Sequence, residues 1–219
     1  MTLPLAGIRV LDLSRHLAGP FAAMTLGDFG AEVIKIEAPG RGDDTRGFPP
    51  YWEGISCYYL SANRNKRSIT LDLGSPEGQA VAHRLLADAD ILIENFRPGT
   101  MERWGLGYED LRQRYPRLLY CAISAVGSDG PDRDRAGVDL LMQAYGGLMS
   151  LTGEEGRPPV RVGTSVVDLT AGANAVQGIL LGLFVRERTG AGQRIESSLL
   201  EGQVSWLTYH AVSYFASGE

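Results

Sequence analysis

Short apolar runs alternate along the chain with polar or glycine-rich segments. In residues 5–14, which read L-A-G-I-R-V-L-D-L-S, apolar and polar positions alternate, which predicts a short β-strand. After Pro20, the apolar residues of 21–29 have helical spacing, and Pro20 suits the first turn of a helix. The run E-V-I-K-I-E at 32–37 predicts a second strand. Because strand, helix and strand follow in this order, the pattern predicts a parallel βαβ unit with a right-handed crossover.

Strand-like alternation and helical spacing of apolar residues continue to the end of the chain. Further strands are expected at 68–73, 91–94, 117–124 and 193–199, and helices at 79–87, 138–149, 171–188 and 201–215. Residues 38–53, rich in Gly, Pro, Asp and Arg, predict a long surface loop. The predicted fold class is α/β, with a Rossmann-like parallel sheet and flanking helices. The turn after the first strand lacks G-x-G-x-x-G, which argues against a nicotinamide or flavin dinucleotide.

Composition is that of a folded, soluble protein. With 219 residues, 44 % of them hydrophobic, the chain is long enough for one domain with a substantial core, and a formal net charge of -5 gives no global attraction to nucleic acid. Cys57 and Cys121 have no C-x-x-C spacing, so neither a disulfide framework nor a metal site is indicated, and a reducing cytoplasm is the default. The most apolar helical stretch, 176–185, is too short to cross a bilayer, so membrane insertion is not expected.

One acidic residue, Asp168, lies between an apolar run and a helix rich in small residues, in the stretch V-G-T-S-V-V-D-L-T-A-G at 162–172. The local pattern favours a helix N-cap, because Asp is among the best capping residues. The surrounding small residues also leave room for a ligand to approach, and few other catalytic candidates exist. Asp168 is therefore the leading catalytic candidate.

Two groups of basic residues adjoin expected strands. Arg64, Lys66 and Arg67 precede the strand at 68–73 and fit either a solvated basic turn or a phosphate contact. Arg97 and Arg103 follow the strand at 91–94, at the carboxyl edge where parallel α/β sheets bind ligands.

Several stretches, taken in order, cover nearly the whole chain and are specific as a set. They read G-I-R-V-L-D-L-S with A-G-P, G-A-E-V-I-K-I-E-A-P-G-R-G-D, N-R-N-K-R-S-I-T-L-D-L, E-N-F-R-P-G, the helix at 139–147, V-V-D-L-T-A-G, and R-T-G-A-G-Q-R-I-E-S-S-L-L-E-G. In this order they resemble the class III CoA-transferase family, the CaiB/BaiF group that includes formyl-CoA, carnitine and succinyl-CoA transferases. The resemblance implies an enzyme that moves CoA from an acyl-CoA, such as succinyl-CoA, to a carboxylic acid.

By the same resemblance Asp168 is the family's catalytic aspartate. The positions that resemble the family's CoA contacts are Leu17, Ala18, Ala38, Leu71, Asp72, Leu73, Gly74, Asn95, Phe96, Arg97, Arg103, Arg135, Gly137 and Asp139. Some oxalate-acting members carry Gln and Arg in place of Leu17 and Ala38, which argues against oxalate. Arg15 is either a replacement cation or an ordinary surface residue.

The implied chemistry needs no permanent cofactor, because coenzyme A and its thioesters are substrates. A carboxylate attacks the thioester carbonyl, frees the CoA thiolate and then takes CoA as an aspartyl thioester. With a reference pKa of about 3.9, an Asp is ionised at neutral pH without a separate base. Backbone N–H groups near Gly163 and Gly172 are hypotheses for stabilising the oxyanions.

The resemblance also implies an architecture. Such enzymes are about twice this length, with a large Rossmann-like domain, a smaller domain and a C-terminal segment that returns to the large domain. Residues 1–219 are therefore expected to form a truncated large domain, with the small domain and the return segment absent. Two chains of the family form an interlocked, ring-like homodimer. The expected partners are thus acyl-CoA, carboxylic acids and a second copy, with no nucleic acid and no membrane.

Two other functions remain open. α-Methylacyl-CoA racemases share this fold and its aspartate, but they use a His immediately before an Asp in the preceding helix, where this chain has Val138. A valine cannot exchange a proton. The second alternative is a non-catalytic CoA-binding or dimer-scaffold fragment. The helix at 201–215 is apolar on more than one face and is expected to be exposed unless a partner covers it.

Overall fold

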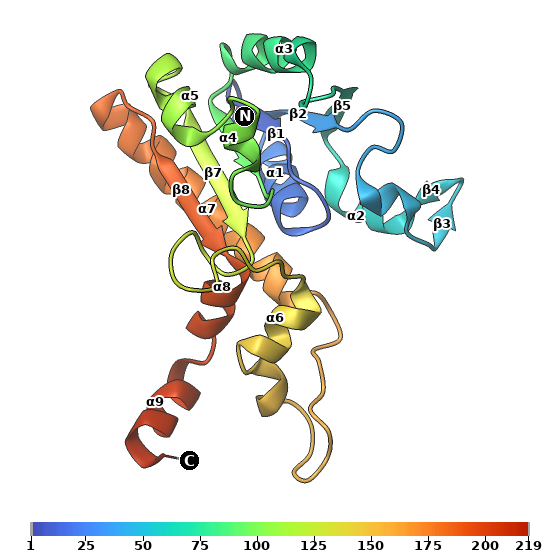
Figure 1. The fold of residues 1–219 in the computed structure, drawn as a ribbon, viewed down its shortest axis with the longest axis vertical. Coiled ribbons are helices and arrows are strands. Elements are labelled where there is room, and N and C mark those ends of the chain that lie inside the picture. Colours follow the sequence, from blue (N-terminus) through green and yellow to red (C-terminus); the bar gives the residue numbers. More distant parts are fainter. Residues whose placement is uncertain (1, 219) are drawn as a thin grey trace.

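The computed structural model describes residues 2–218 and centres on a six-stranded parallel sheet (Figure 1). Its strands are β1 (Arg9–Asp12), β2 (Glu32–Glu37), β5 (Lys66–Thr70), β6 (Ile91–Glu94), β7 (Leu119–Ser124) and β8 (Arg194–Ser198). Their order across the sheet is β5-β2-β1-β6-β7-β8, and every pair is parallel. This order confirms the predicted Rossmann-like fold. The direction of winding reverses between β1 and β6.

Helices cover both faces of the sheet. The helices among the described residues are α1 (Ala18–Asp28), α2 (Cys57–Asn63), α3 (Pro76–Leu86), α4 (Thr100–Arg103), α5 (Tyr108–Arg114), α6 (Asp139–Tyr145), α7 (Val166–Thr189), α8 (Leu199–Ser205) and α9 (Thr208–Ser217), and not all of them pack on the sheet. Residues of α1 and α7 form one buried cluster with the sheet, and residues of α3, α4 and α5 form a second cluster. The fold therefore has three layers, with a core on each side of the sheet.

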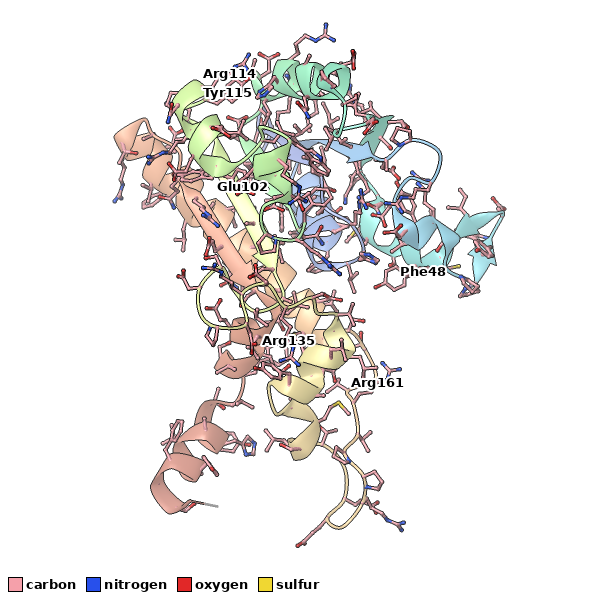
Figure 2. All side chains as sticks on the ribbon, in the orientation of Figure 1. Phe48, Glu102, Arg114, Tyr115, Arg135 and Arg161 are labelled. Atoms are coloured by element: carbon pink, nitrogen blue, oxygen red, sulfur yellow. The ribbon has the colours of Figure 1, made fainter. Side chains whose placement is uncertain are left out.

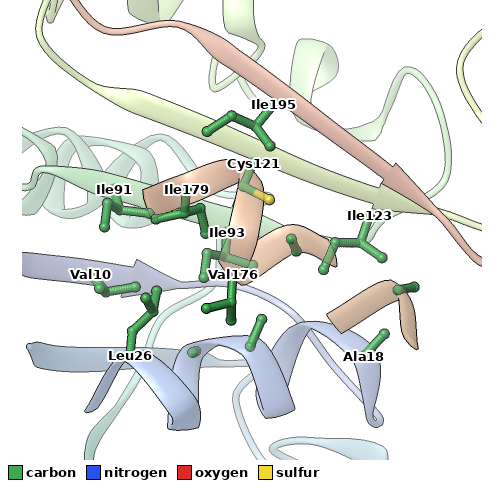
Figure 3. Packing of buried hydrophobic residues seen from close by; sticks show 14 of the residues in the cluster. Val10, Ala18, Leu26, Ile91, Ile93, Cys121, Ile123, Val176, Ile179 and Ile195 are labelled. Atoms are coloured by element: carbon green, nitrogen blue, oxygen red, sulfur yellow. The ribbon is translucent and has the colours of Figure 1, made fainter. Parts of the chain in front are cut away.

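The core follows the alternation of the strands. Within β6, Ile91 and Ile93 belong to the cluster with α1 and α7, and Leu92 belongs to the other. Figure 3 shows Ile91 and Ile93 among side chains of α1 and α7, including Leu26 and Val176. Successive side chains of a strand point to opposite faces, so a strand buried on both faces has a continuous apolar sequence.

The long helix α7 differs from its prediction. It begins at Val166 rather than at residue 171, so Asp168 lies in its first turn. It is also long and apolar enough to cross a membrane, contrary to the expected short stretch, although 44 % of its most apolar window is buried. It packs along α1 so closely that a Cβ on Gly172 would lie 2.6 Å from the carbonyl oxygen of Ala18. These contacts are those of a core helix.

Three other predicted segments differ from expectation, because each is divided into shorter elements of regular structure. The loop at 38–53 contains a 3-10 helix and leads into a hairpin, and the helix at 138–149 is α6 followed by a second 3-10 helix. The predicted helix at 201–215 is two helices, α8 and α9, with a bend between them. The bounds of the short elements are Asp44–Gly47 and Leu148–Leu151 for the 3-10 helices, and β3 (Tyr51–Trp52) and β4 (Ile55–Ser56) for the hairpin.

A buried ionic network lies at the carboxyl end of β1 and β2. Lys66 Nζ lies 2.9 Å from Asp12 Oδ2, and Lys35 Nζ lies 3.0 Å from Asp43 Oδ2. Lys35 also donates to the carbonyl oxygen of Ser14 at 2.7 Å. Burial opposes ionisation of both aspartates. Lys66 and Lys35 outweigh it at Asp12, and Lys35 with the hydrogen bonds from Thr45 outweighs it at Asp43, so the pKa of each aspartate is lowered. The network fixes the turn after β1 against the segment after β2.

Helices α8 and α9 lead away from the sheet (Figure 1), and the described part of α9 has no buried residue. Large apolar side chains are open on this segment, among them Trp206 at 52 %, Tyr209 at 69 % and Phe215 at 83 % exposure. The structure thus confirms the expected exposed apolar surface.

Candidate active site

A cavity of about 560 Å³ opens at the carboxyl ends of β1, β6 and β7. Its walls come from residues 16–18, 95–98 and 133–140, and from the start of α7. This is the reversal point of the sheet, where open α/β folds bind ligands. A larger hollow of about 700 Å³ lies between α3 and α5, around His83 and Arg114, and holds none of the predicted site residues.

Asp168 lies in the wall of this cavity. It is half-buried, and within residues 2–218 its carboxylate makes no hydrogen bond or ion pair. The N-cap of α7 is Ser165, so Asp168 is not the cap that the local pattern favoured. Burial, and then the charge of Asp139, raises the pKa of Asp168 to about 7. Asp168 is therefore partly protonated at neutral pH, where its reference pKa had predicted full ionisation.

A second carboxylate, Asp139 at the start of α6, is fully hydrogen-bonded. Its Oδ1 accepts from the backbone N–H groups of Val167 at 2.8 Å and Asp168 at 3.2 Å, and its Oδ2 accepts from Gln143 Nε2 at 2.5 Å. The residue is only 7 % exposed. Both oxygens are thus used inside the protein, whereas the resemblance gave Asp139 a CoA contact. Of the two neighbouring carboxylates, only that of Asp168 is open to a substrate.

The predicted CoA contacts fall into two groups. Those that line the cavity with Asp168 are Leu17, Ala18, Asn95, Phe96, Arg97, Arg135, Gly137 and Asp139. Those that lie outside it are Ala38, Leu71, Asp72, Leu73, Gly74 and Arg103. The ring of Trp104 stands edge-on to Phe96, with centroids 5.0 Å apart, and its Nε1 lies 4.0 Å from where a Cβ of Gly74 would be. The rings of Phe96 and Trp104 therefore lie between the cavity and the outer residue Gly74.

The sequence did not predict the aromatic wall of the cavity. The rings of Phe48 and Tyr58 meet edge to face at 5.6 Å, and the ring of His16 lies 6.3 Å from Phe48. Burial, and then nearby carboxylates with Asp168 first, raises the pKa of Tyr58 to about 12, so its hydroxyl stays protonated. Figure 2 shows Phe48 beside α2 and Arg161 beside α6, on two sides of the site. The only local signal for this wall was the Ser56 cap that starts α2.

Cationic side chains line the cavity. They are Arg97, Arg133, Arg135 and Arg161, and Arg15 lies nearby with its guanidinium 5.1 Å from the ring centre of Phe96. Clustered guanidinium groups bind carboxylates and phosphates well. The basic residues at the start of β5 and just before it pair with acids elsewhere in the fold: Arg64 with Asp28, Lys66 with Asp12 and Arg67 with Glu32. Across residues 2–218, no group of His, Cys, Asp and Glu is placed to hold a metal ion.

Comparison with known proteins extends the resemblance to most of the chain. The sequence pattern of CoA-transferase family III matches residues 5–219. A succinyl-CoA:glutarate CoA-transferase of Mus musculus is 48 % identical over 212 residues, which cover 96 % of this chain and 49 % of that protein. A succinate-glutarate CoA-transferase of Agrobacterium fabrum is 44 % identical, over 98 % of this chain and 56 % of that protein. The chain spans about half the length of the curated relatives it matches.

The fold agrees with the sequence match. The crystal structure of a CAIB/BAIF family protein from Brucella suis superposes with a TM-score of 0.96 at 43 % identity, covering 100 % of this chain and 59 % of that one. The agreement therefore includes the sheet order and the connections that build the cavity. Together, the match over residues 5–219 and this superposition show that the chain belongs to CoA-transferase family III.

Proposed function

We propose that this chain carries the acyl-transfer centre of a CoA-transferase, which moves CoA from an acyl-CoA such as succinyl-CoA to a dicarboxylic acid such as glutarate. The observation that carries the proposal is the open carboxylate of Asp168 in a cavity at the reversal point of the sheet. The choice of acids follows relatives whose names pair succinate with glutarate. The cluster of arginines supports it, because both acids are dianions.

The reaction balances without an oxidant or a reductant. An oxygen of ionised Asp168 attacks the thioester carbonyl carbon, and the C–S bond breaks to release CoA thiolate. The thiolate attacks the aspartyl carbonyl of the mixed anhydride, which releases the donor acid and leaves CoA on Asp168 as a thioester. The acceptor carboxylate attacks that thioester and frees the thiolate again. Attack of the thiolate on the acceptor's acyl carbon then forms the new acyl-CoA and restores Asp168.

Each addition places negative charge on a carbonyl oxygen inside the cavity. Tyr58 lines this cavity with a hydroxyl that remains protonated, and it is our candidate donor to that charge. Of the two glycines expected nearby, Gly172 is packed against α1, whereas Gly163 has open space around it. Gly163 is therefore the remaining glycine candidate for a backbone donor.

The nucleotide part of CoA would lie outside the cavity. Of the outer group of predicted contacts, Gly74 lies next to Trp104, whose ring contacts Phe96 in the cavity wall, and Leu71 to Leu73 and Arg103 adjoin these two residues in the sequence. A CoA molecule whose thioester is at Asp168 would pass these rings and place its nucleotide there. The exposed guanidinium of Arg103, which donates to Thr100 Oγ1 at 3.0 Å, would meet its phosphates.

We also propose that two chains associate and that α8 and α9 take part in the contact. Exposed aromatic side chains on one segment, such as those of Trp206 and Phe215, are typical of surfaces that a partner covers. Light scattering on the purified chain is expected to give the mass of a dimer. A monodisperse monomer would contradict this proposal.

Trapping with succinyl-CoA and borohydride tests the proposed function. Borohydride reduces an aspartyl thioester or anhydride to an alcohol, and mass spectrometry of peptides is expected to locate that change at Asp168. Only the ionised carboxylate attacks, so the trapping rate should rise with pH to a midpoint near 7. It should be about a hundredfold lower at pH 5 than at pH 9.

Asp88→Asn is the matched control, because this side chain is 75 % exposed and its one ion pair among residues 2–218 is with Arg9. The variant should be trapped at the wild-type rate. Modification of a different carboxylate, or trapping that does not depend on pH, would count against Asp168 as nucleophile. If calorimetry shows CoA binding and no trapping occurs, the chain is the non-catalytic CoA-binding protein instead.

A further inference from the structure

We propose that Asp139 and Gln143, on successive turns of α6, form a positioning pair that holds the first turn of α7 and controls the ionisation of Asp168. The catalytic meaning of this pair rests on the proposed function. The positioning itself does not, because it follows from hydrogen bonds between α6 and α7.

The first observation is that α7 has no cap of its own. The first N–H groups of a helix lack partners within the helix and need acceptors from elsewhere. The side chain of the N-cap residue Ser165 makes no capping hydrogen bond. Asp139 takes that role from another helix, because its Oδ1 accepts from the N–H groups of Val167 and Asp168. The backbone N–H of Asp168 is thus bound to the carboxylate whose charge acts on the Asp168 side chain.

Gln143 holds the segment that leads into α7. It is completely buried, and its Oε1 accepts from the backbone N–H of Val162 at 2.8 Å. Its Nε2 donates to Asp139 Oδ2 and, at 3.3 Å, to the carbonyl oxygen of Thr164. The single amide therefore ties the segment that enters α7 to the residue that caps it. Movement of α6 would therefore shift Asp139 and the segment that enters α7 together.

The pair also acts through charge. Asp139 is a buried acid beside Asp168, and its charge is, after burial, the cause of the raised pKa of Asp168. One other acid lines the cavity, Asp134, with a side chain that is 78 % exposed. Tyr58 from α2 stays neutral.

Four arginines also line the cavity. They are Arg97 after β6, Arg133 and Arg135 before α6, and Arg161 before α7, and His16 after β1 lies among them. A positive charge favours the ionised form of a carboxyl, whereas the negative charge of Asp139 disfavours it. Removal of the Asp139 charge therefore leaves the cations without an opposing buried acid.

Two substitutions separate position from charge. Asp139→Asn keeps a carbonyl oxygen for the two N–H groups and removes the charge, and it also replaces the oxygen that accepts from Gln143 Nε2 with an NH2 group. Asp139→Ala removes the charge and every acceptor. Carboxyl 13C NMR, with the Asp168 signal assigned from Asp168→Asn, is expected to show a midpoint near pH 7 in the wild type. In Asp139→Asn that midpoint should fall by about one pH unit or more.

Amide hydrogen exchange reads out the positioning. Exchange at Val167 and Asp168 should stay near the wild-type rate in Asp139→Asn and become about threefold to thirtyfold faster in Asp139→Ala, because a lost cap loosens the first turn. Gln143→Met, similar in volume, should speed exchange at Val162, whose N–H loses its acceptor.

Asp129→Asn is the matched control, since this carboxylate is exposed in the same connection before α6. It should change neither readout. An unchanged Asp168 midpoint in Asp139→Asn would overturn the control of ionisation, and unchanged exchange in a folded Asp139→Ala would overturn the positioning. Neither measurement uses acyl-CoA, so a failed trapping experiment would contradict the proposed function alone.

Discussion

Asp168→Asn is expected to reduce acyl transfer by at least about 10⁴-fold and, in the same protein, to raise stability above pH 7. The loss follows because an amide lacks the nucleophilic oxygen that the proposed reaction needs. The gain follows from the burial and the repulsion that raise the pKa of Asp168 to about 7. A buried charge beside another carboxylate opposes folding, and a neutral amide of the same shape does not.

The sign of the pH dependence follows from linkage. The folded chain binds the Asp168 proton more tightly than the unfolded chain, whose carboxyl has the model value of 3.8. The wild type therefore loses stability as the pH rises from about 4 to 7, and the penalty is complete above 7. The variant should gain about 2 to 4 kcal/mol there and little near pH 4.

Thermal unfolding of both proteins between pH 4 and 9 measures this difference. The Asp88→Asn variant, with an exposed carboxylate, should follow the wild type throughout. A stability difference that is the same at every pH would mean that Asp168 is not held at a raised pKa. Wild-type acyl transfer in Asp168→Asn would place the nucleophile elsewhere.

The sequence predicted the sheet well because its strands are locally encoded. A strand buried on both faces has a continuous apolar run, and β6, which begins I-L-I, lies where that run predicts it. β2 lies at the predicted E-V-I-K-I-E, although its Lys35 interrupts the apolar run. The start of α7 was missed because Asp139 caps it from 28 and 29 residues away, and no local pattern contains that contact. The expected CoA contact of Asp139 came from the family resemblance, which carries no information on this hydrogen bonding to α7.

The site was predictable only in part. Asp168 was found from its small neighbours and from the family resemblance, while its raised pKa depends on burial and on Asp139, which only the fold supplies. The aromatic wall of Phe48 and Tyr58 was missed because residue 48 lies in a segment predicted to be a surface loop and the short α2 was not predicted. The position of that segment depends on long-range partners, such as the backbone N–H of His16, which donates to Asp43 Oδ1 across 27 residues.

Lys35→Met is expected to destabilise the chain by about 3 to 5 kcal/mol, because it removes one partner from a buried ionic network. Lys35 is the cation within 3.0 Å of Asp43 Oδ2, an oxygen that has no hydrogen-bond donor among the described residues. Its loss leaves a buried carboxylate unpaired and the carbonyl oxygen of Ser14 without its donor. Chemical denaturation of both proteins at pH 7 measures the effect.

The same substitution links the network to the active site. Asp43 Oδ1 accepts from the backbone N–H of His16 at 3.4 Å, and His16 lines the cavity, so a displaced Asp43 should also weaken CoA binding in calorimetry. The pKa of Asp43 is lowered, so its pairing stabilises the fold above the unfolded value of 3.8 and ceases to do so as the pH falls through the folded value. The deficit of Lys35→Met should therefore narrow below about pH 4. Arg64→Met is the matched control, because it breaks the ion pair with Asp28, in which the arginine side chain is 58 % exposed. It should lower the free energy of unfolding by no more than about 1 kcal/mol. An equal loss in both variants would show that burial does not set the strength of the Lys35 network.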